Sequence, residues 1–520
     1  MTATEPDFER FRLRRLVEDL TRHGEVEVHE EPVALADLSS IIEASGKAVL
    51  FRKAGPQQLE LVAGVMGSRR RLAIALGVAE EDSLREYQHR MANPQPHFEV
   101  PSADAPVHQV VLTGDDIDLA SLPFHLQHDL DGGPNISAAM DFSVDPATGK
   151  RNVGCRRLML RGHRQLTSNL TQRSDLKLTY LACLERGERL PVSFAIGAHP
   201  TAFLAATLRR PGDEFGLVAT LRGAPLPMVR GVTNGVPAPA DAEMIIEGYF
   251  DELGYREIDG PYGEFWGFYG AAHPDPVFTV TAIAMRRDVL HQSVLHGGRD
   301  MARMEMTPTG ALNIEAAVWQ ALRAAGIEPA AVHAVGAVSV GQHIRVALAS
   351  AAPGQARAVI SLLFAMRGMK HVVVVDSDID VRSDGEVQWA LSTRFRADRD
   401  LVVMDGFPAY YSDPTAEGGT LAKVGFDATA GPTGDSIEEW RPLPPRVSRE
   451  RSAGSVREAL QAGPLYFREL MDALGSDDGR EIALELDALR DKGELARGAN
   501  GRWQLTGPGP ALPATRIFSG

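Results

Sequence analysis

The sequence predicts a mixed α/β (α+β) protein of several domains, and two observations support this prediction. At 520 residues the chain is too long for one hydrophobic core, so roughly two to four domains are expected. Short alternating strands dominate the middle of the chain, whereas helices and strands alternate before and after it. We therefore predict an N-terminal α/β domain over 1–107, a β-barrel domain over 108–305, a C-terminal α/β domain over 306–445, and a linker with a small extension over 446–520.

The N-terminal part alternates helix and strand patterns. Apolar residues recur on one face of a predicted helix over 7–23, which Gly24 ends. The basic run at 69–71 is compatible with a phosphate site, although a solvated helix face is the favoured interpretation. The other predicted elements are a strand at 25–29, a helix at 36–44 and extended segments at 49–51 and 59–65.

The middle part reads as a β-rich barrel with inserted helices. No Gly-x-Gly-x-x-Gly follows a strand and no Walker sequence occurs, so a nicotinamide-binding Rossmann unit and a P-loop have no support. Helices are predicted at 175–185 and 240–250. Strands are predicted at 109–113, 138–144, 156–161, 192–196 and 278–284.

The C-terminal domain alternates helix and strand in the βα manner. Helices are predicted at 313–325 and 354–366, strands within 332–349, and a buried strand at 370–375. The following Asp376, Asp378 and Asp380 imitate the first half of a calcium loop. Valines occupy its sixth and twelfth positions, where Gly and Glu are needed, so no calcium loop is expected.

A Pro-rich segment at 442–446 leads into the extension. Three predicted helices, at 455–460, 466–474 and 480–492, and a two-stranded segment at 494–505 indicate a winged helix. Residues 455–506 hold 7 Lys or Arg against 10 Asp or Glu, which would repel phosphates. We therefore favour a dimerisation or docking element over DNA binding.

The composition predicts a cytoplasmic protein without nucleic-acid or membrane partners. The net charge is −15. No stretch approaches the ~18 apolar residues of a membrane span, and the N-terminus has no export signal. Two cysteines, Cys155 and Cys183, provide neither a disulfide framework nor a cysteine-based zinc site. A nucleophilic role for Cys155 is less favoured than that of a small buried residue.

Two carboxylates, Asp259 and Glu264, bracket a Gly-Pro-Tyr-Gly turn and form a candidate acid site. An ordinary surface turn has the same appearance. The four large aromatics among 265–269 favour a pocket, since they are costly on a bare surface. Arg157, at the start of a β-like run, could hold one carboxylate ionised while burial raises the pKa of the other. Such a pair can shuttle a proton.

Three motifs, in this order, resemble the UbiD family of prenylated-FMN-dependent (de)carboxylases. They are Asn-Val-Gly-x-x-Arg at 152–157, Asp-Gly-Pro-Tyr-Gly-Glu at 259–264, and Val-Val-Val-Val-Asp-Ser-Asp-Ile-Asp at 372–380 with Gln-Trp-Ala-Leu-Ser-Thr-Arg at 388–394. The similarity extends over about 5–442. The resemblance implies a central split β-barrel that binds flavin, a flavin prenyltransferase as cofactor supplier, and a homodimer or higher homo-oligomer.

The resemblance also implies a cofactor site. A divalent metal, manganese above all, would be held by Asn152 and Glu214 against the flavin phosphate, with potassium as an additional monovalent cation. Many members have His where this chain has Arg173, which cannot bind a metal but can pair with phosphate. The other residues placed around the flavin are Cys155, Arg156, Arg157, Asn169, Leu170, Thr171, Gln172, Arg173, Ser174 and Lys370.

For the chemistry, the resemblance implies that Glu264 donates a proton to the carbon that loses CO2. Arg157 would orient the substrate carboxylate or hold Asp259 ionised, and Asp259 stands where Glu is common. Small residues at 205–207 and 295–298 favour an aromatic or heteroaromatic carboxylic acid over a short acrylic acid. His296 and His199 are candidates for binding a ring heteroatom or phenol, although a structural role is favoured for each.

Two alternatives remain open at this stage. The enzyme can run as a carboxylase, because microscopic reversibility uses the same groups. A non-catalytic flavin-binding scaffold would instead have no need for Glu264.

Overall fold

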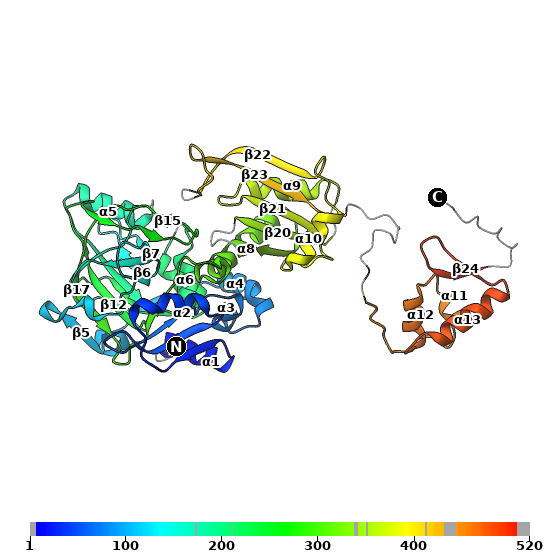
Figure 1. The fold of residues 1–520 in the computed structure, drawn as a ribbon, viewed down its shortest axis with the longest axis horizontal. Coiled ribbons are helices and arrows are strands. Elements are labelled where there is room, and N and C mark those ends of the chain that lie inside the picture. The colour runs from blue at the N-terminus through cyan, green and yellow to red at the C-terminus, as the bar shows by residue number, and fades with distance from the viewer. Residues whose placement is uncertain are drawn as a thin grey trace. The chain divides into compact units, whose positions relative to one another are not determined.

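The protein is described from a computed structural model. The structure describes residues 7–171, 174–210, 212–336, 342–349, 352–410, 413–430, 442 and 444–506. The chain divides into two compact units, Met1–Thr429 and Ala430–Gly520 (Figure 1). Among the described residues, no helix is both long and apolar enough to cross a membrane.

The N-terminal domain packs helices around a small sheet of order β1-β2-β3-β18. β1 lies parallel to β2, β2 antiparallel to β3, and β18 parallel to β3. The elements are α1 (Leu13–Arg22), β1 (Val26–His29), α2 (Leu38–Ala44), β2 (Ala48–Ala54), β3 (Leu59–Ala63), α3 (Arg69–Leu76), α4 (Ser83–Ala92) and β18 (His291–Ser293).

Two predictions for this domain were wrong in part. The first helix begins at Leu13 rather than at residue 7, because Arg12 stays extended and its guanidinium pairs with Glu243 at 3.0 Å and Asp288 at 2.8 Å. The basic run at 69–71 is a solvated helix face only at Arg70, which is exposed. Its arginines pair with Glu315 or Glu25, and Arg71 is buried.

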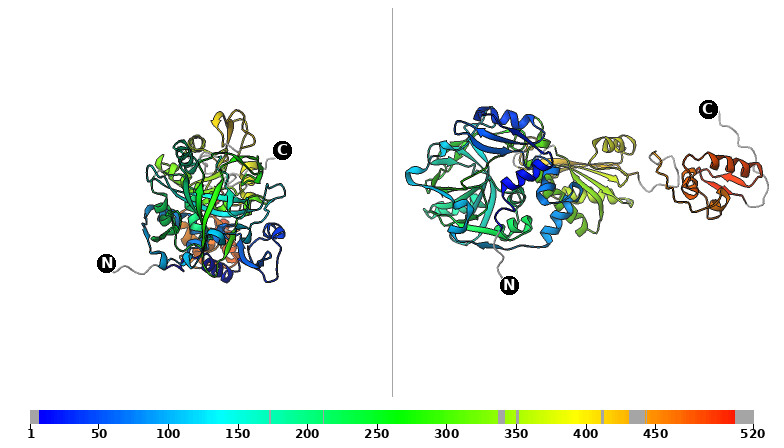
Figure 2. Two further views of the ribbon diagram at one scale, coloured as in Figure 1. Left: turned by 90° about the vertical axis from the view of Figure 1, so that its left-hand side faces the viewer. Right: turned by 90° about the horizontal axis from the view of Figure 1, so that it is seen from below.

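A closed barrel forms the middle of the chain. Six described strands close in the order β12-β9-β6-β7-β8-β17, since β12 also pairs with β17, and β5 adds to β17. These strands, cyan to green, can be followed in Figure 2. Their bounds are β5 (Val110–Thr113), β6 (Asn135–Val144), β7 (Arg151–Leu160), β8 (Gln165–Thr167), β9 (Leu190–Ile196), β12 (Met244–Phe250) and β17 (Phe278–Met285).

Helices and short pairings surround the barrel. β14 pairs with β15, and β13 with β16, as hairpins near the site described below. These elements are β4 (His97–Glu99), α5 (Asp175–Glu185), α6 (Pro200–Ala206), α7 (Glu214–Arg222), β10 (Leu226–Arg230), β11 (Pro237–Pro239), β13 (Glu257–Asp259), β14 (Tyr262–Gly263), β15 (Tyr269–Gly270) and β16 (His273–Asp275). Short 3-10 helices are η1 (Leu35–Asp37), η2 (Glu80–Asp82), η3 (Ser102–Asp104), η4 (Pro106–His108), η5 (Gly114–Asp116), η6 (Leu119–Ser121) and η7 (Met301–Arg303).

The helix predicted at 240–250 was wrong, because residues 244–250 form the barrel strand β12. β-Branched and aromatic residues favour a strand here, and β12 is hydrogen-bonded to β9 and β17 on its two sides. Gly248 lies at a register shift, where an added Cβ would stand 2.1 Å from the Thr279 carbonyl oxygen. Tertiary pairing therefore overrides the helix propensity of the alanine, methionine and glutamate residues in this segment.

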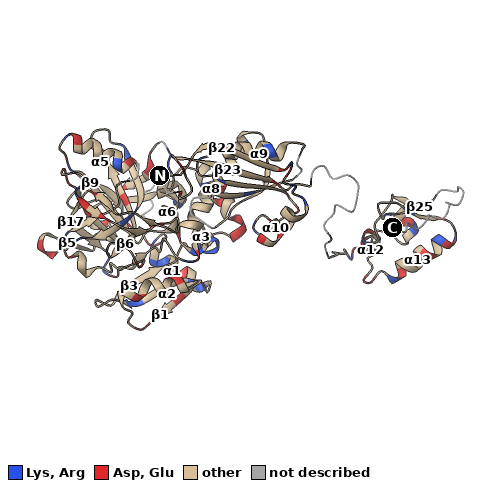
Figure 3. Cartoon of the chain, turned by 45° about the horizontal axis from the view of Figure 1, so that its top comes forward, with Lys and Arg blue, Asp and Glu red and all other residues tan. Residues whose placement is uncertain are grey.

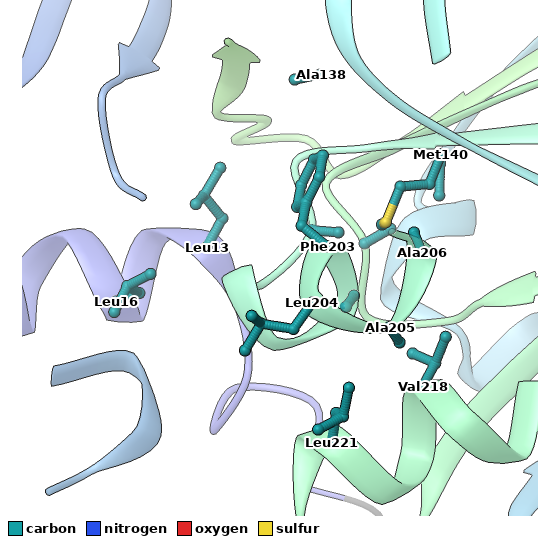
Figure 4. Close-up of a cluster of buried hydrophobic side chains, with 14 of the residues drawn as sticks. Leu13, Leu16, Ala138, Met140, Phe203, Leu204, Ala205, Ala206, Val218 and Leu221 are labelled. Carbon is teal, nitrogen blue, oxygen red and sulfur yellow. The ribbon is translucent and has the colours of Figure 1, made fainter. Parts of the chain in front are cut away.

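Both faces of the barrel strands are buried. On β9, Val192, Phe194 and Ile196 belong to one apolar cluster and Ala195 to another, as a period of two requires. The second cluster reaches α1, so the N-terminal domain and the barrel share a core. Figure 4 shows side chains of α1, α6, α7 and β6 in this core.

The C-terminal domain is a sheet of order β19-β20-β21-β23-β22 with helices. Asp376 and Asp378 pair with Arg394, at 3.3 and 2.6 Å. The elements are α8 (Met306–Ala324), β19 (Pro329–Ala334), β20 (His343–Leu348), α9 (Gln355–Phe364), β21 (His371–Asp376), α10 (Asp384–Thr393), β22 (Leu401–Pro408) and β23 (Thr420–Asp427).

The described part of the second unit has three helices followed by a two-stranded sheet, in the order of elements expected from the sequence, and its winged-helix fold stays a prediction. Leu465 bridges to Trp503 and adds a third extended segment to the wing. The unit has its own apolar core, and acidic and basic residues are interspersed over it (Figure 3). Its elements are α11 (Val456–Gln461), α12 (Phe467–Leu474), α13 (Arg480–Asp491), β24 (Leu495–Arg497) and β25 (Trp503–Leu505).

Candidate active site

A buried ion pair lies at the centre of the candidate site. Arg157, on β7, donates to both carboxylate oxygens of Asp259, on β13, at 3.0 and 2.5 Å. The Thr167 hydroxyl donates to the same carboxylate at 2.7 Å. Asp259 is fully buried, and Arg157 is 6% exposed. The Asp259 carboxylate therefore accepts three hydrogen bonds, two from a bidentate guanidinium and one from a hydroxyl.

An aromatic ring covers this pair. The Arg157 guanidinium lies 4.5 Å from the centre of the Tyr262 ring. The Tyr262 hydroxyl donates to Gln127 and lies 2.8 Å from His296 Nδ1. Burial, with the charges of His128 and Arg157, lowers the pKa of His296 to about 3. His296 is therefore a neutral ring at the edge of the site.

Glu264 lies beside the ion pair with a different environment. Burial raises the pKa of the Glu264 carboxyl, Arg157 opposes this rise, and Asp259 adds to it. Its side chain receives a long hydrogen bond from Asn169 Nδ2, at 3.4 Å. The two carboxyl groups of the site thus have different surroundings: Asp259 is paired with a guanidinium, whereas Glu264 receives one long hydrogen bond.

A second polar cluster lies along β7. Asp141, buried on β6, accepts from Asn152 Nδ2 at 2.6 Å and from Arg156 Nε at 2.8 Å. Because the Asn152 amide nitrogen is engaged, its Oδ1 is the atom left to bind a ligand. Glu214, at the start of α7, accepts from the Val153 backbone N–H at 2.7 Å through one carboxylate oxygen. Burial raises the pKa of the Glu214 carboxyl.

Both clusters open into one cavity of about 770 Å³. The C-terminal domain contributes part of its wall, through α8 and through Arg367 and Tyr410. The Tyr410 ring packs on Trp266, with centroids 5.4 Å apart. The aromatic run after the turn therefore lies at the junction of two domains.

The structure brings most of the predicted site residues to this cavity. Those that line it are Asn152, Cys155, Arg156, Arg157, Asn169, Ser174, Glu214 and Glu264, and, of the predicted pocket residues, Ala206, Thr207 and His296. Asp259 lies behind them. Burial raises the pKa of the Cys155 thiol to about 12, which keeps it protonated and disfavours a nucleophile.

Other predicted residues lie elsewhere. Leu170 is buried in the barrel core, and Thr171 bonds to Asn169 rather than lining the cavity. Lys370 does not line the cavity; it pairs with Asp413 at 3.0 Å. His199 is the N-cap of α6 and lies outside the cavity, as the structural interpretation of this residue expects. Gln172 and Arg173 lie outside the described residues.

Sequence reasoning missed two buried acids, Asp141 and Asp275. Asp275, on β16, accepts from the backbone N–H groups of Ser168 and Leu170, at 3.0 and 2.6 Å. Asp141 interrupts an apolar strand, which is a local signal of a buried acid. Asp275 ends the short strand His273–Asp275, which is not apolar and gives no such signal.

Comparison with known proteins identifies the family. Residues 17–91, 98–299 and 307–428 match, in turn, the N-terminal, Rift-related and C-terminal domains of 3-octaprenyl-4-hydroxybenzoate carboxy-lyase, UbiD. The chain belongs to the UbiD family. A UbiD-family protein is a decarboxylase or carboxy-lyase, and the arrangement of acids described above lies in its central domain.

This chain aligns with nearly the whole length of several relatives of the UbiD family. Anhydromevalonate phosphate decarboxylase of Methanosarcina mazei is 30% identical over 80% of this chain and 95% of the relative. HmfF from Pelotomaculum thermopropionicum in complex with FMN has a TM-score of 0.78 and 30% identity, over 83% of this chain and 97% of that chain. An evolved dimeric form of HmfF, in complex with prFMN, has a TM-score of 0.74 and 29% identity, over 84% and 97%.

Proposed function

We propose that the protein catalyses the non-oxidative, reversible decarboxylation of an unsaturated carboxylic acid with prenylated FMN as cofactor. The observation that carries this proposal is the contrast between Asp259, which Arg157 holds as an ionised pair, and Glu264, whose pKa burial raises in the same cavity. The relatives whose structures contain FMN or prFMN support the choice of cofactor.

The chain's own residues have distinct tasks in this reaction. When bound, prenylated FMN supplies the electron sink that loss of CO2 from an sp2 carbon requires. Arg157 orients the substrate carboxylate, while Asp259 keeps the guanidinium in place. Glu264 then delivers a proton to the carbon that carried the carboxylate. In the carboxylation direction Glu264 removes that proton.

The second cluster suits the phosphate end of the cofactor. Arg156 and Ser174 bring a guanidinium and a hydroxyl to the cavity wall, and Asn152 and Glu214 bring two oxygens for a hard cation such as manganese, with potassium as a further cation. No set of three His, Cys, Asp or Glu side chains suited to a metal occurs in the part of the chain that the structure describes.

For the substrate we propose an aromatic or heteroaromatic acid. The small side chains of Ala206 and Thr207 leave width in the cavity, and His296 offers a neutral nitrogen to a ring substituent. A second candidate is a non-aromatic acid with a distal phosphate, because Arg209 and Arg367 line the same cavity and a relative acts on anhydromevalonate phosphate. If Arg367→Met abolished the turnover of a phosphorylated acid but not that of an aryl acid, the result would favour this second substrate class.

The experiment that tests the proposal uses protein co-expressed with a flavin prenyltransferase. We expect the absorbance and mass of a modified flavin, and CO2 release from aryl acids that disappears in Glu264→Gln. Glu252→Gln is the matched control, since Glu252 pairs with Arg189 outside the cavity. Full activity of Glu264→Gln would refute the role of Glu264. A protein that binds flavin but releases no CO2 from any acid would support the scaffold alternative.

A homodimer or larger homo-oligomer is also proposed, since a dimeric form of the relative HmfF exists. Light scattering of the purified protein at several concentrations tests it.

A further inference from the structure

A short segment beside the ion pair is fixed by a buried carboxylate. The two oxygens of Asp275 accept the backbone N–H groups of Leu170 and Ser168, at 2.6 and 3.0 Å, one on each side of Asn169. Asn169 itself has a φ of +54°, in the left-handed region that non-glycine residues rarely adopt. A conformation of this kind persists only when its surroundings hold it.

The Asn169 side chain is also held in one orientation. The Thr171 hydroxyl donates to Asn169 Oδ1 at 2.7 Å. With its oxygen engaged, the amide presents its nitrogen to Glu264 Oε1, at 3.4 Å. The direction of the amide is thus set by a hydrogen bond that does not itself reach the cavity.

Asp275 occupies a position linked to the catalytic acids. Its strand, β16, pairs with β13, which carries Asp259, and the register places Asp275 opposite Glu257, two residues before Asp259. Asp275 is fully buried. The charged and titratable groups that interact with it are Asp259, Arg157, Tyr255 and Tyr180.

We propose that Asp275 is a positioning residue of the reaction, which holds the Ser168–Leu170 segment so that the Asn169 amide nitrogen is directed at Glu264. This inference rests on the proposed function, because it takes Glu264 as the proton donor and Asn169 as the residue that acts on it. Asp275 does not line the cavity, so in this proposal it acts through Asn169.

The consequence concerns the acidity of Glu264. An N–H donor favours an ionised carboxylate, so the Asn169 amide opposes the rise in pKa that burial causes. A reversed amide would place its oxygen there and favour the protonated acid. The other groups that interact with Glu264 are Arg157, Asp259, His128, Asp131 and Tyr262, and none of them is replaced in the test below.

The test compares Thr171→Val and Asp275→Asn as prenylated holoenzymes. Thr171→Val removes the hydroxyl that fixes the Asn169 amide, so the amide can turn its oxygen toward Glu264. The pKa of Glu264 then rises, and activity that needs protonated Glu264 persists to higher pH. We expect the alkaline limb of kcat to move upward by about one pH unit. Thr281→Val is the matched control, since this threonine bonds to Thr233 on the barrel and lies outside the cavity. It should leave the limb unchanged.

Asp275→Asn adds a readout that is independent of turnover. An amide retains one acceptor, so either Ser168 or Leu170 loses its partner. We expect the exchange of that backbone amide with deuterium, measured by mass spectrometry, to be at least about tenfold faster than in wild type. Where Asp275→Asn fails to fold, the wild type decides instead: the Ser168 and Leu170 amides should exchange slowly, because Asp275 accepts both, and fast exchange of both would overturn the inference. A purely structural Asp275 would lower kcat equally at every pH.

An unmoved alkaline limb in Thr171→Val, or unchanged exchange in folded Asp275→Asn, would overturn the inference. Failure of the proposed function is a different result, namely full activity of Glu264→Gln.

Discussion

Replacing Asp259 by Asn tests the central ion pair of the site. The substitution keeps the shape of the side chain but removes the charge that Arg157, 6% exposed, meets at 2.5 and 3.0 Å. Breaking a buried pair by neutralising one partner leaves the other charge uncompensated, which costs about 3–5 kcal/mol. We expect the free energy of unfolding of the flavin-free protein to fall by about this amount.

Urea unfolding followed by tryptophan fluorescence measures the loss. Asp398→Asn is the control, because Asp398 pairs with Arg396 at 2.9 Å on the surface and its removal should change stability little. The double variant Arg157→Met with Asp259→Leu removes both charges and should recover most of the loss. If Asp259→Asn loses no more stability than Asp398→Asn, the argument that this pair is desolvated and strongly coupled is wrong.

Two further predictions concern pH and the second unit. Burial raises the pKa of Glu305 from 4.5 to about 7, so its contribution to stability is greatest at low pH and is lost as the pH rises from about 4.5 to 7. In urea unfolding, the free energy of unfolding of Glu305→Gln should therefore rise relative to that of wild type between pH 5.5 and 8, by roughly 1.4 kcal/mol per pH unit at most. If the difference between the two proteins were the same at both pH values, this prediction would be wrong. Truncation after residue 430 should preserve flavin binding and CO2 release, because the second unit has its own core and the family match ends at 428. Loss of flavin binding in a folded truncated protein would refute this prediction.

Much of the barrel could be predicted because its strands alternate. On β9, Val192, Phe194 and Ile196 fall on one face, and the pattern indicates a strand without any knowledge of its neighbours. The segment at 240–250 could not be predicted in this way. Its alanines and acids also suit a helix, and only the pairing with β9 and β17 decides the matter.

The candidate site shows the same limit at the level of single side chains. Arg157, Asp259 and Glu264 stand in motifs, and the structure brings them together; their roles stay a prediction. Asp275 stands in no motif, and its hydrogen-bond partner Ser168 is 107 residues away in the sequence. A lone Asp at the end of a strand gives no indication of what it will bind, because its function depends entirely on the folded neighbourhood.

The assignment of acid and ionised partner follows from the neighbours of each carboxylate. Asp259 receives two guanidinium bonds and a hydroxyl, whereas Glu264 receives one amide at 3.4 Å. Exchanging the roles would require Arg157 to leave a pair in which it is itself buried, and an unpaired buried guanidinium is costly. Proton delivery from Glu264 requires no such separation of charges. The geometry therefore favours Glu264 as the donor in the proposed reaction, and Asp259 as the group that keeps Arg157 fixed while the proton moves.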